Sequence, residues 1–339
     1  MRRLILLATL FALPLAAQQP QVQNGRLTTD AQTNPQVELN KLLAGGETTW
    51  LAYTVPTPNH VDYNSNEVTY LEGDQYSRSN DTRQPGAPTY RALILLRIAD
   101  HAVGSVRIAD PSRKIDAGGT NIVYLPSVDP GQSITMLQSL AEHSNGNRLR
   151  DGAILALSIH QSPRTVPALA QLAGPGNDSA LREKAAFWLS TQHGAEAAAI
   201  LERFARDDKD DRFREKLTFD LTLVHQPSAS QTLVRMAHQD ASPQVRRQAQ
   251  FWMAHIASEI GSKNVAADLG DAATNDANES IRKSAVFSLT QLPNGEGTPK
   301  LIELAQTSKD PAVRKQAVFW LGQSSDPRAL DFLTRLIQQ

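Results

Sequence analysis

The stretch from Asp310 to Leu321 reads DPAVRKQAVFWL, and its pattern returns along the chain at a fixed interval. Each copy carries an arginine at the position of Arg314: Arg150, Arg182, Arg214, Arg246, Arg282 and Arg314. Four intervals are 32 residues long (182−150, 214−182, 246−214 and 314−282), and one is 36 (282−246). Self-similarity at such a period indicates one supersecondary unit that is stacked on copies of itself.

The residues around each arginine predict an amphipathic helix. Four residues before each of the last five arginines stands a residue type that caps helix N-termini: Asp178, Asp210, Ser242, Asn278 or Asp310. Pro243 and Pro311 follow two of these caps, where the missing N–H of proline costs nothing. The residues one before, three after and seven after each arginine are apolar. At about 100° per residue they share one face, which we expect to pack on a partner helix.

A second helix is expected after each arginine-bearing helix. We place these second helices at Ala195–Ala205, Ser230–Ala237, Pro299–Ala305 and Arg328–Ile337. One such pair cannot bury its apolar face alone, whereas a stack of pairs can. The long interval between Arg246 and Arg282 holds four extra residues (36−32), in or beside the Ser258–Ser262 connection, which predicts an irregular repeat there.

The run D-P-x-V-R-x-x-A-x-x-x-L, seen whole at Asp310–Leu321, resembles the signature of HEAT repeats. The repeat length resembles that of the shorter repeats of the phycobilisome-lyase-like branch. The resemblance covers residues 129–339 and implies a right-handed α-α solenoid of about six repeats. It also implies that the arginine-bearing helices line the concave side and that the solenoid binds proteins. A bilin-lyase activity does not follow, because fold does not carry function.

The resemblance further implies a ladder in which each arginine pairs with an acidic residue from the loop between helices. Six residues before an arginine stand Asp208, Asp240 and Asp276, but the equivalent positions are Gly176 and Ser308 in two repeats. We therefore expect an incomplete ladder. As isolated surface pairs these would contribute little stability, so their expected role is to set the register of the repeats.

A row of phenylalanines lies outside the apolar face of the arginine-bearing helices. Five residues after each of the last five arginines stand Phe187, Phe219, Phe251, Phe287 and Phe319. At this spacing each ring points away from the apolar face, so the five rings form a stripe that is a candidate partner-binding surface. The other interpretation is that each ring packs between neighbouring arginine-bearing helices, which is commoner for aromatic residues at helical spacing. Half-buried rings would be consistent with both interpretations.

The residues before Asp129 predict a small α+β module, residues 18–128. We expect a helix at Gln36–Leu43, strands at Thr48–Val55 and Asn121–Leu125, and a hairpin of Arg91–Ala99 with Val103–Ile108. Residues 18–35 are polar and are expected to be loosely ordered. Residues 56–88 read as one long polar loop. Its acidic positions depart from the calcium-loop pattern, since Glu67 stands in place of the turn glycine.

Residues 1–17 predict a Sec-type signal peptide. Arg2 and Arg3 precede an apolar run from Leu4, and small residues lead to an expected cleavage after Ala17. The run is shorter than the ~20 residues of a spanning helix, and no other run is long enough. The sequence therefore predicts a bacterial protein that is periplasmic or secreted, with no membrane span after cleavage.

Composition excludes several chemistries. The chain has no cysteine, and 34 Lys+Arg face 35 Asp+Glu, so thiol chemistry is impossible and a nucleic-acid footprint is not expected. We find no hydrolase or phosphate-binding motif and no His-Glu dipeptide of the kind that holds di-iron in some HEAT-like enzymes. No catalytic residue, metal site or cofactor is predicted, and histidines at helix ends, such as His160, read as surface residues.

The sequence thus favours an exported, non-enzymatic scaffold that binds another protein on the concave face. The alternative is an envelope enzyme, or an accessory factor of one, with a small-ligand site in the N-terminal module. That alternative needs polar side chains converging on a cleft around Trp50, Tyr53 and the hairpin.

Overall fold

The computed structural model describes residues 19–58, 68–72, 90–144, 146–192 and 194–338. Their contacts divide the chain into two compact units, Met1–Thr165 and Val166–Gln339. The expected signal peptide and most of the 56–88 segment lie outside the described residues. None of the described helices has both the length and the apolar composition that a membrane crossing requires.

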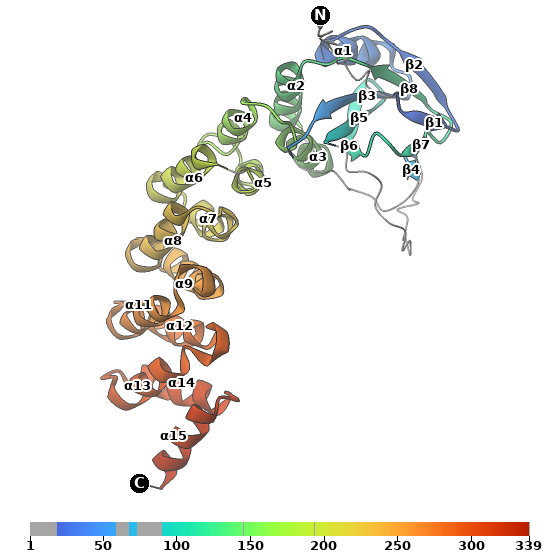
Figure 1. Ribbon diagram of the computed structural model, residues 1–339. Coiled ribbons are helices and arrows are strands. Elements are labelled where there is room, and N and C mark those ends of the chain that lie inside the picture. The colour runs from blue at the N-terminus through green and yellow to red at the C-terminus, as the bar shows by residue number, and fades with distance from the viewer. Residues whose placement is uncertain (1–18, 59–67, 73–89, 145, 193, 339) are drawn as a thin grey trace, which may run out of the picture. The chain divides into compact units, whose positions relative to one another are not determined.

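The first unit is built on a five-stranded sheet (Figure 1). Its order is β2 (Arg26–Thr29), β8 (Asn121–Leu125), β3 (Thr49–Pro56), β5 (Arg91–Ala99) and β6 (Ala102–Ala109). The central strand β3 runs antiparallel to β5 and parallel to β8, and all its residues before Pro56 are buried. A strand buried at every position has both faces covered, as in the core of a larger α/β arrangement.

The expected hairpin and helix of this unit are confirmed. β5 and β6 join through Asp100 and His101, whose φ angles of 52° and 61° are those of a two-residue hairpin turn. The helix α1 spans Pro35–Gly45 and ends at Gly46, where φ is 70°. Glycine suits that left-handed position because it has no Cβ.

Two expectations for the N-terminal segments were wrong. Residues expected to be loosely ordered form β1 (Gln21–Gln23) and β2, and a further strand, β4 (Val68–Tyr70), lies inside the segment that read as one polar loop. β1 and β4 flank β7 (Lys114–Asp116) in a separate three-stranded sheet. These short strands exist because distant segments pair with them, as in the register of Gln21 with Lys114.

The first arginine-bearing helix packs on the sheet. α2 (Pro130–His143) and α3 (Asn147–Ser158) contact each other, and α3 also lies against β6. A Cβ at Gly152 of α3 would lie 2.7 Å from the carbonyl oxygen of Val106, so only glycine allows this approach. The division between units therefore falls after Thr165, whereas the change of sequence pattern falls at Asp129.

The second unit is a stack of helix pairs in two layers (Figure 1). One layer holds the arginine-bearing helices α5 (Ser179–Ser190), α7 (Asp211–Leu223), α9 (Pro243–His255), α12 (Glu279–Thr290) and α14 (Pro311–Gly322). The other helices are α4 (Thr165–Leu172), α6 (Ala195–Asp207), α8 (Pro227–Gln239), α11 (Ser262–Asn275), α13 (Thr298–Thr307) and α15 (Pro327–Ile337). The expected α-solenoid, preceded by a small α+β module, is confirmed.

The predicted capping and burial are also confirmed. All five expected residues are N-caps, and four of them accept hydrogen bonds from first-turn amides, as Asp310 does from Ala312 at 2.8 Å. Ser242 is the exception, since its Oγ donates to side chains instead. The apolar face is buried in the last five repeats, with Leu181 its most exposed member at 2%.

The four extra residues form a short helix of their own. α10 (Ala257–Ile260) follows α9 and ends at Gly261, whose φ of 96° favours glycine. It lies where the sequence placed the irregular repeat. Beside it is a pocket of about 610 Å³ whose lining includes Val224, Ile260 and Val265.

Candidate binding surface

The arginine-bearing helices are joined by a ladder of ion pairs. Nε and Nη2 of Arg214 donate to the two carboxylate oxygens of Asp240, at 2.9 Å each. Arg246 pairs with Asp276 in the same way, at 2.8 and 3.0 Å. Arg182 pairs with Asp208, and two nitrogens of Arg282 approach Asp310 at 2.8 and 2.9 Å. Two parallel hydrogen bonds fix both distance and orientation.

The same arginines also hold the loop of their own repeat. Nη1 of Arg246 donates to the backbone carbonyl of Asp240 at 2.7 Å, while the carboxylate of Asp240 accepts from Arg214. The equivalent bond recurs from Arg214 to Asp208, from Arg282 to Asp276 and from Arg314 to Ser308. One aspartate thus links two successive repeats, which sets their register.

Two expectations about the ladder were wrong. The pairs are not surface pairs, because the side chains of Arg214 and Asp240 are only 11% and 7% exposed. The gap expected at Ser308 is filled by Asp310, two residues later, which caps α14 and pairs with Arg282 at the same time. The amide of Ala312 and the guanidinium of Arg282 lower the pKa of Asp310.

Asp276 stays ionised because its partners outweigh burial. Burial alone raises the pKa of Asp276, but the hydrogen bonds from Arg246 and from the amide of Asn278 bring it below its ordinary value. The charge of Arg282 acts in the same direction. A carboxylate that is both buried and paired is costly to leave without its partner.

The five phenylalanines, which we call the phenylalanine row, lie on neighbouring helices of this layer. Phe187, Phe219, Phe251 and Phe287 are half-buried, and Phe319 is 54% exposed. The rings of Phe187 and Phe219 stack with centroids 6.5 Å apart and planes 10° from parallel. The row is therefore neither core nor free surface, and its rings both pack between helices and keep exposed area.

Tryptophans follow three of these phenylalanines, and two of them, Trp252 and Trp320, pack back onto the preceding helix. Trp252 lies 4.8 Å from the ring of Phe219, and Trp320 lies 5.2 Å from that of Phe287, centroid to centroid. These contacts join successive repeats. Among the described residues, neither indole nitrogen has a hydrogen-bond partner, although both are buried.

Asp220 occupies a tryptophan position and is 4% exposed. Burial, followed by the charge of Glu183 on the preceding helix, raises the pKa of Asp220 to about 7, while Lys216 opposes the shift. Ser288, which follows Phe287, occupies the equivalent position on α12 and has no exposed area. A carboxyl group whose charge changes near neutral pH therefore lies next to the phenylalanine row.

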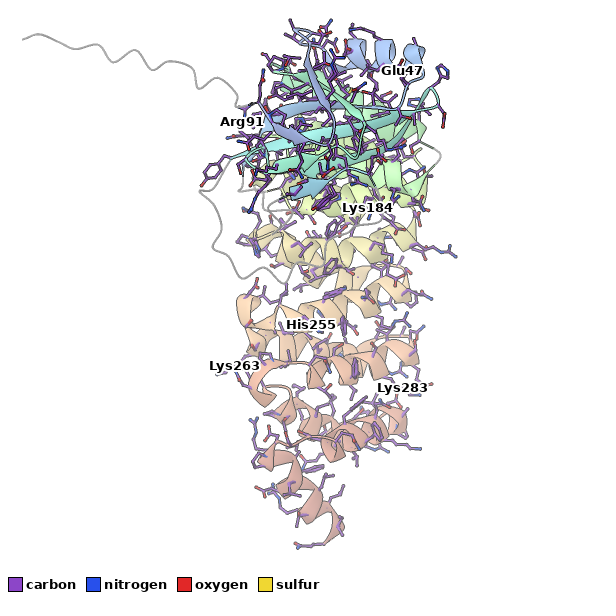
Figure 2. The ribbon with its side chains drawn as sticks, turned by 90° about the vertical axis from the view of Figure 1, so that its right-hand side faces the viewer. Glu47, Arg91, Lys184, His255, Lys263 and Lys283 are labelled. Carbon is purple, nitrogen blue, oxygen red and sulfur yellow. The ribbon has the colours of Figure 1, made fainter. Side chains whose placement is uncertain are left out.

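Figure 2 faces the layer of arginine-bearing helices and shows His255 near its middle. Its ring lies 4.2 Å from that of Phe251 and 5.4 Å from that of Trp252, and the residue is exposed. His255 follows Phe251 by one helical turn. It adds a polar group to the aromatic surface without being part of the repeat pattern.

A buried polar network in the first unit was missed by sequence reasoning. His160, expected at the surface, is 2% exposed, and burial lowers its pKa to about 4. Nδ1 therefore carries the proton and donates to the carbonyl of Ala156 at 2.8 Å, and Nε2 accepts from Ser133 Oγ at 2.9 Å. The hydroxyl of Tyr53 lies 2.9 Å from the same Oγ. The network ties the sheet to α2 and to the end of α3.

The residues that a small-ligand site would use are enclosed. Trp50 and Tyr53 have no exposed area, and Trp50 Nε1 donates to Glu72 Oε1 at 3.0 Å. Arg97 donates to the same oxygen at 2.8 Å. In the described part of the chain, no group of three His, Asp or Glu side chains could hold a metal ion.

The match to a known family agrees with this architecture. Residues 265–339 match the family model of HEAT repeats. Human deoxyhypusine hydroxylase is similar at 15% identity over 60% of this chain and 77% of its own, with a TM-score of 0.34. Escherichia coli YibA is similar at 20% identity over 62% of this chain and 79% of its own, with a TM-score of 0.38. The CpcE–CpcF complex of phycocyanin lyase from Nostoc is similar at 17% identity. The similarity covers 58% of this chain and 77% of that chain, with a TM-score of 0.31. No curated protein matches the sequence.

The family match covers the last repeats, and these share their arginine, capping residues and buried face with the copies before them. Helix pairs that pack by one rule along the stack are the mark of a repeat architecture. Residues 265–339 therefore match HEAT repeats, and the helix pairs before them repeat the same sequence pattern.

Proposed function

We propose that this protein is an exported, non-enzymatic scaffold that binds another protein across the face of its arginine-bearing helices, the concave face in HEAT solenoids. The observation that carries the proposal is the phenylalanine row. Monomeric proteins rarely leave a contiguous apolar stripe on their surface without a use for it. Partly exposed aromatic rings held on a rigid ladder of helices are suited to serve as anchors for a partner.

Export is proposed from residues 1–17, whose charged, apolar and small-residue segments follow the order of a secretory signal. We expect cleavage near Ala17 and a periplasmic or secreted product. Mass spectrometry of the protein from its native cells tests this, since a mature N-terminus at Gln18 is expected. A retained Met1 would contradict export by this route.

A role without catalysis is supported by the burial of Trp50 and Tyr53, the residues around which the enzyme alternative would need a cleft. The polar atoms of both side chains form hydrogen bonds inside the unit. A ligand would have to displace that packing to reach them.

Affinity capture with matched variants tests the binding role. Serine at 219, 251 and 287 removes three rings of the row, while Leu330→Ser removes an apolar side chain that is 66% exposed on α15. We expect the triple variant to lose the partner and Leu330→Ser to keep it, with circular dichroism confirming that both are folded. A partner captured equally by the triple variant would place the site elsewhere.

A further inference from the structure

We infer that the C-terminal half of the phenylalanine row, on α9, α12 and α14, binds an acidic segment of the partner. In this arrangement apolar side chains of the partner lie on the rings, and its carboxylates meet the cations beside them. The inference rests on the proposed function and specifies the chemistry of the partner.

A column of charged residues runs beside the phenylalanine row. Each member precedes its phenylalanine by four residues: Glu183, Glu215, Arg247, Lys283 and Lys315. Residues four apart lie on the same side of a helix, one turn from each other. We call these five residues the charged column. It changes sign once, after α7, so that two carboxylates precede three cations.

The cations of the charged column are available to a ligand. Arg247 and Lys315 are exposed, and neither forms an ion pair with any described side chain. Lys283, seen at the edge of the layer in Figure 2, contacts Glu279 at 2.6 Å, but the two side chains are 43% and 58% exposed. Such exposed pairs are weak enough to exchange for a partner's carboxylate.

The neighbouring positions strengthen the contrast between the two halves. The residues after Arg247, Lys283 and Lys315 are uncharged, namely Gln248, Ser284 and Gln316. In the first half Lys184 and Lys216 follow the two glutamates, so that end carries both signs. The carboxyl of Asp220 lies there too, close enough to Glu183 for their charges to interact. A carboxylate ligand is therefore attracted to α9–α14 and finds no net attraction at α5–α7.

This charge pattern argues for one class of occupant. Complementary charge steers association and selects among partners, while buried aromatic anchors supply most of the affinity. The exposed ring of Phe319 and the half-buried rings of Phe251 and Phe287 lie beside the three cations. A segment that alternates apolar and acidic side chains satisfies both sets of groups, whereas a basic segment meets like charge.

A displayed library of random 16-residue peptides, selected against the immobilised full chain, tests the inference. We expect enriched peptides to combine Asp or Glu with Leu, Phe or Trp. The dissociation constant of one enriched peptide is then measured against two charge variants of equal net charge. One variant reverses the site (Arg247→Glu, Lys283→Glu and Lys315→Glu). The other reverses exposed cations elsewhere (Arg203→Glu, Lys263→Glu and Lys309→Glu).

The expected result is that site reversal weakens the peptide at least about tenfold and that the matched variant changes its affinity less than about twofold. A copy of the peptide with Lys for each acidic residue should prefer the site-reversed variant. Enrichment of neutral or basic peptides, no enrichment, or equal binding to both variants overturns the inference.

The phenylalanine variants separate this inference from the proposed function. If serine at 219, 251 and 287 abolishes peptide binding while site reversal leaves it intact, the row binds a partner but not through charge. If the serine variant binds every enriched peptide as the original chain does, the proposed function fails with the inference.

Discussion

Arg214 and Asp240 meet through two parallel hydrogen bonds of 2.9 Å across the junction of two successive repeats. Both side chains are largely buried, at 11% and 7% exposure. The pair lies on α7 and in the loop after α8, so its geometry sets how α7 and α9 lie against each other. The positions of Phe219 and Phe251 depend on that arrangement.

Removing one member of this pair should destabilise the stack. We expect Arg214→Ala or Asp240→Ala to cost about 3 kcal/mol, because each leaves a buried charge without its partner. The double variant should cost less than the sum of the two. Hydrogen exchange of the α7 and α9 amides measures the local free energy of opening. Additive single and double costs would show that the pair does not act as a unit.

Asp220 should destabilise the solenoid above neutral pH. Its pKa in the folded protein is about 7, raised from 3.8, so the stability present below pH 3.8 is lost as pH rises through 7. The shift corresponds to roughly 4 kcal/mol at high pH. Asp220→Asn should therefore stabilise the protein, by about 2 kcal/mol more at pH 8.5 than at pH 5.5.

Urea unfolding of the second unit at both pH values checks this prediction for Asp220. Asp268→Asn is a suitable control, because it removes a half-buried carboxylate from α11 at the same cost in charge. An equal gain at both pH values for Asp220→Asn would show that its carboxyl titrates normally.

His160 should make the first unit acid-sensitive. Its pKa falls from 6.5 to about 4 on burial, so stability is complete above pH 6.5 and is lost as pH falls toward 4. Between pH 7.5 and pH 4.5 we expect a loss of about 2–3 kcal/mol from this residue. His160→Gln can still hydrogen-bond to Ser133 and should remove that part of the pH dependence. An unchanged pH profile in the variant would contradict the assignment.

Gly152 should be intolerant of even a methyl group. A Cβ added at this position would lie 2.7 Å from the carbonyl oxygen of Val106, so α3 would have to move off β6. We expect Gly152→Ala to lower the free energy of unfolding of the first unit by about 2 kcal/mol. Gly146→Ala, where no atom lies within 4 Å of the added Cβ, should be nearly neutral. Equal thermal midpoints for the two variants would rule out this close approach.

The solenoid was predictable because its information is local and repeated. A capping residue, an arginine and three apolar residues within one helix recur, and each copy supports the others, as Asp178 and Asp210 do at the starts of α5 and α7. The hairpin at Asp100 and His101 was predictable for the same reason, since its strands adjoin in sequence.

What sequence reasoning missed depends on distant partners. β1 is a strand only because Lys114–Asp116 lies beside it, more than ninety residues away (114−21 = 93). His160 is buried because α2 and β3 bring Ser133 and Tyr53 to it. Asp310 was predicted only as a helix cap, and its second role as the ion-pair partner of Arg282 was missed. The partial exposure of the phenylalanine row depends on how far apart neighbouring helices pack, which no single helix specifies.

Site-specific photo-crosslinking in the native cells tests the binding face most directly. p-Benzoylphenylalanine replaces Phe251 or Phe287 in the row, or Lys263 on α11, which Figure 2 shows at the opposite edge from Lys283. We expect a covalent adduct with one partner protein from positions 251 and 287 and none from position 263. Adducts from position 263 alone, or equally from all three positions, would show that the partner does not bind at the phenylalanine row.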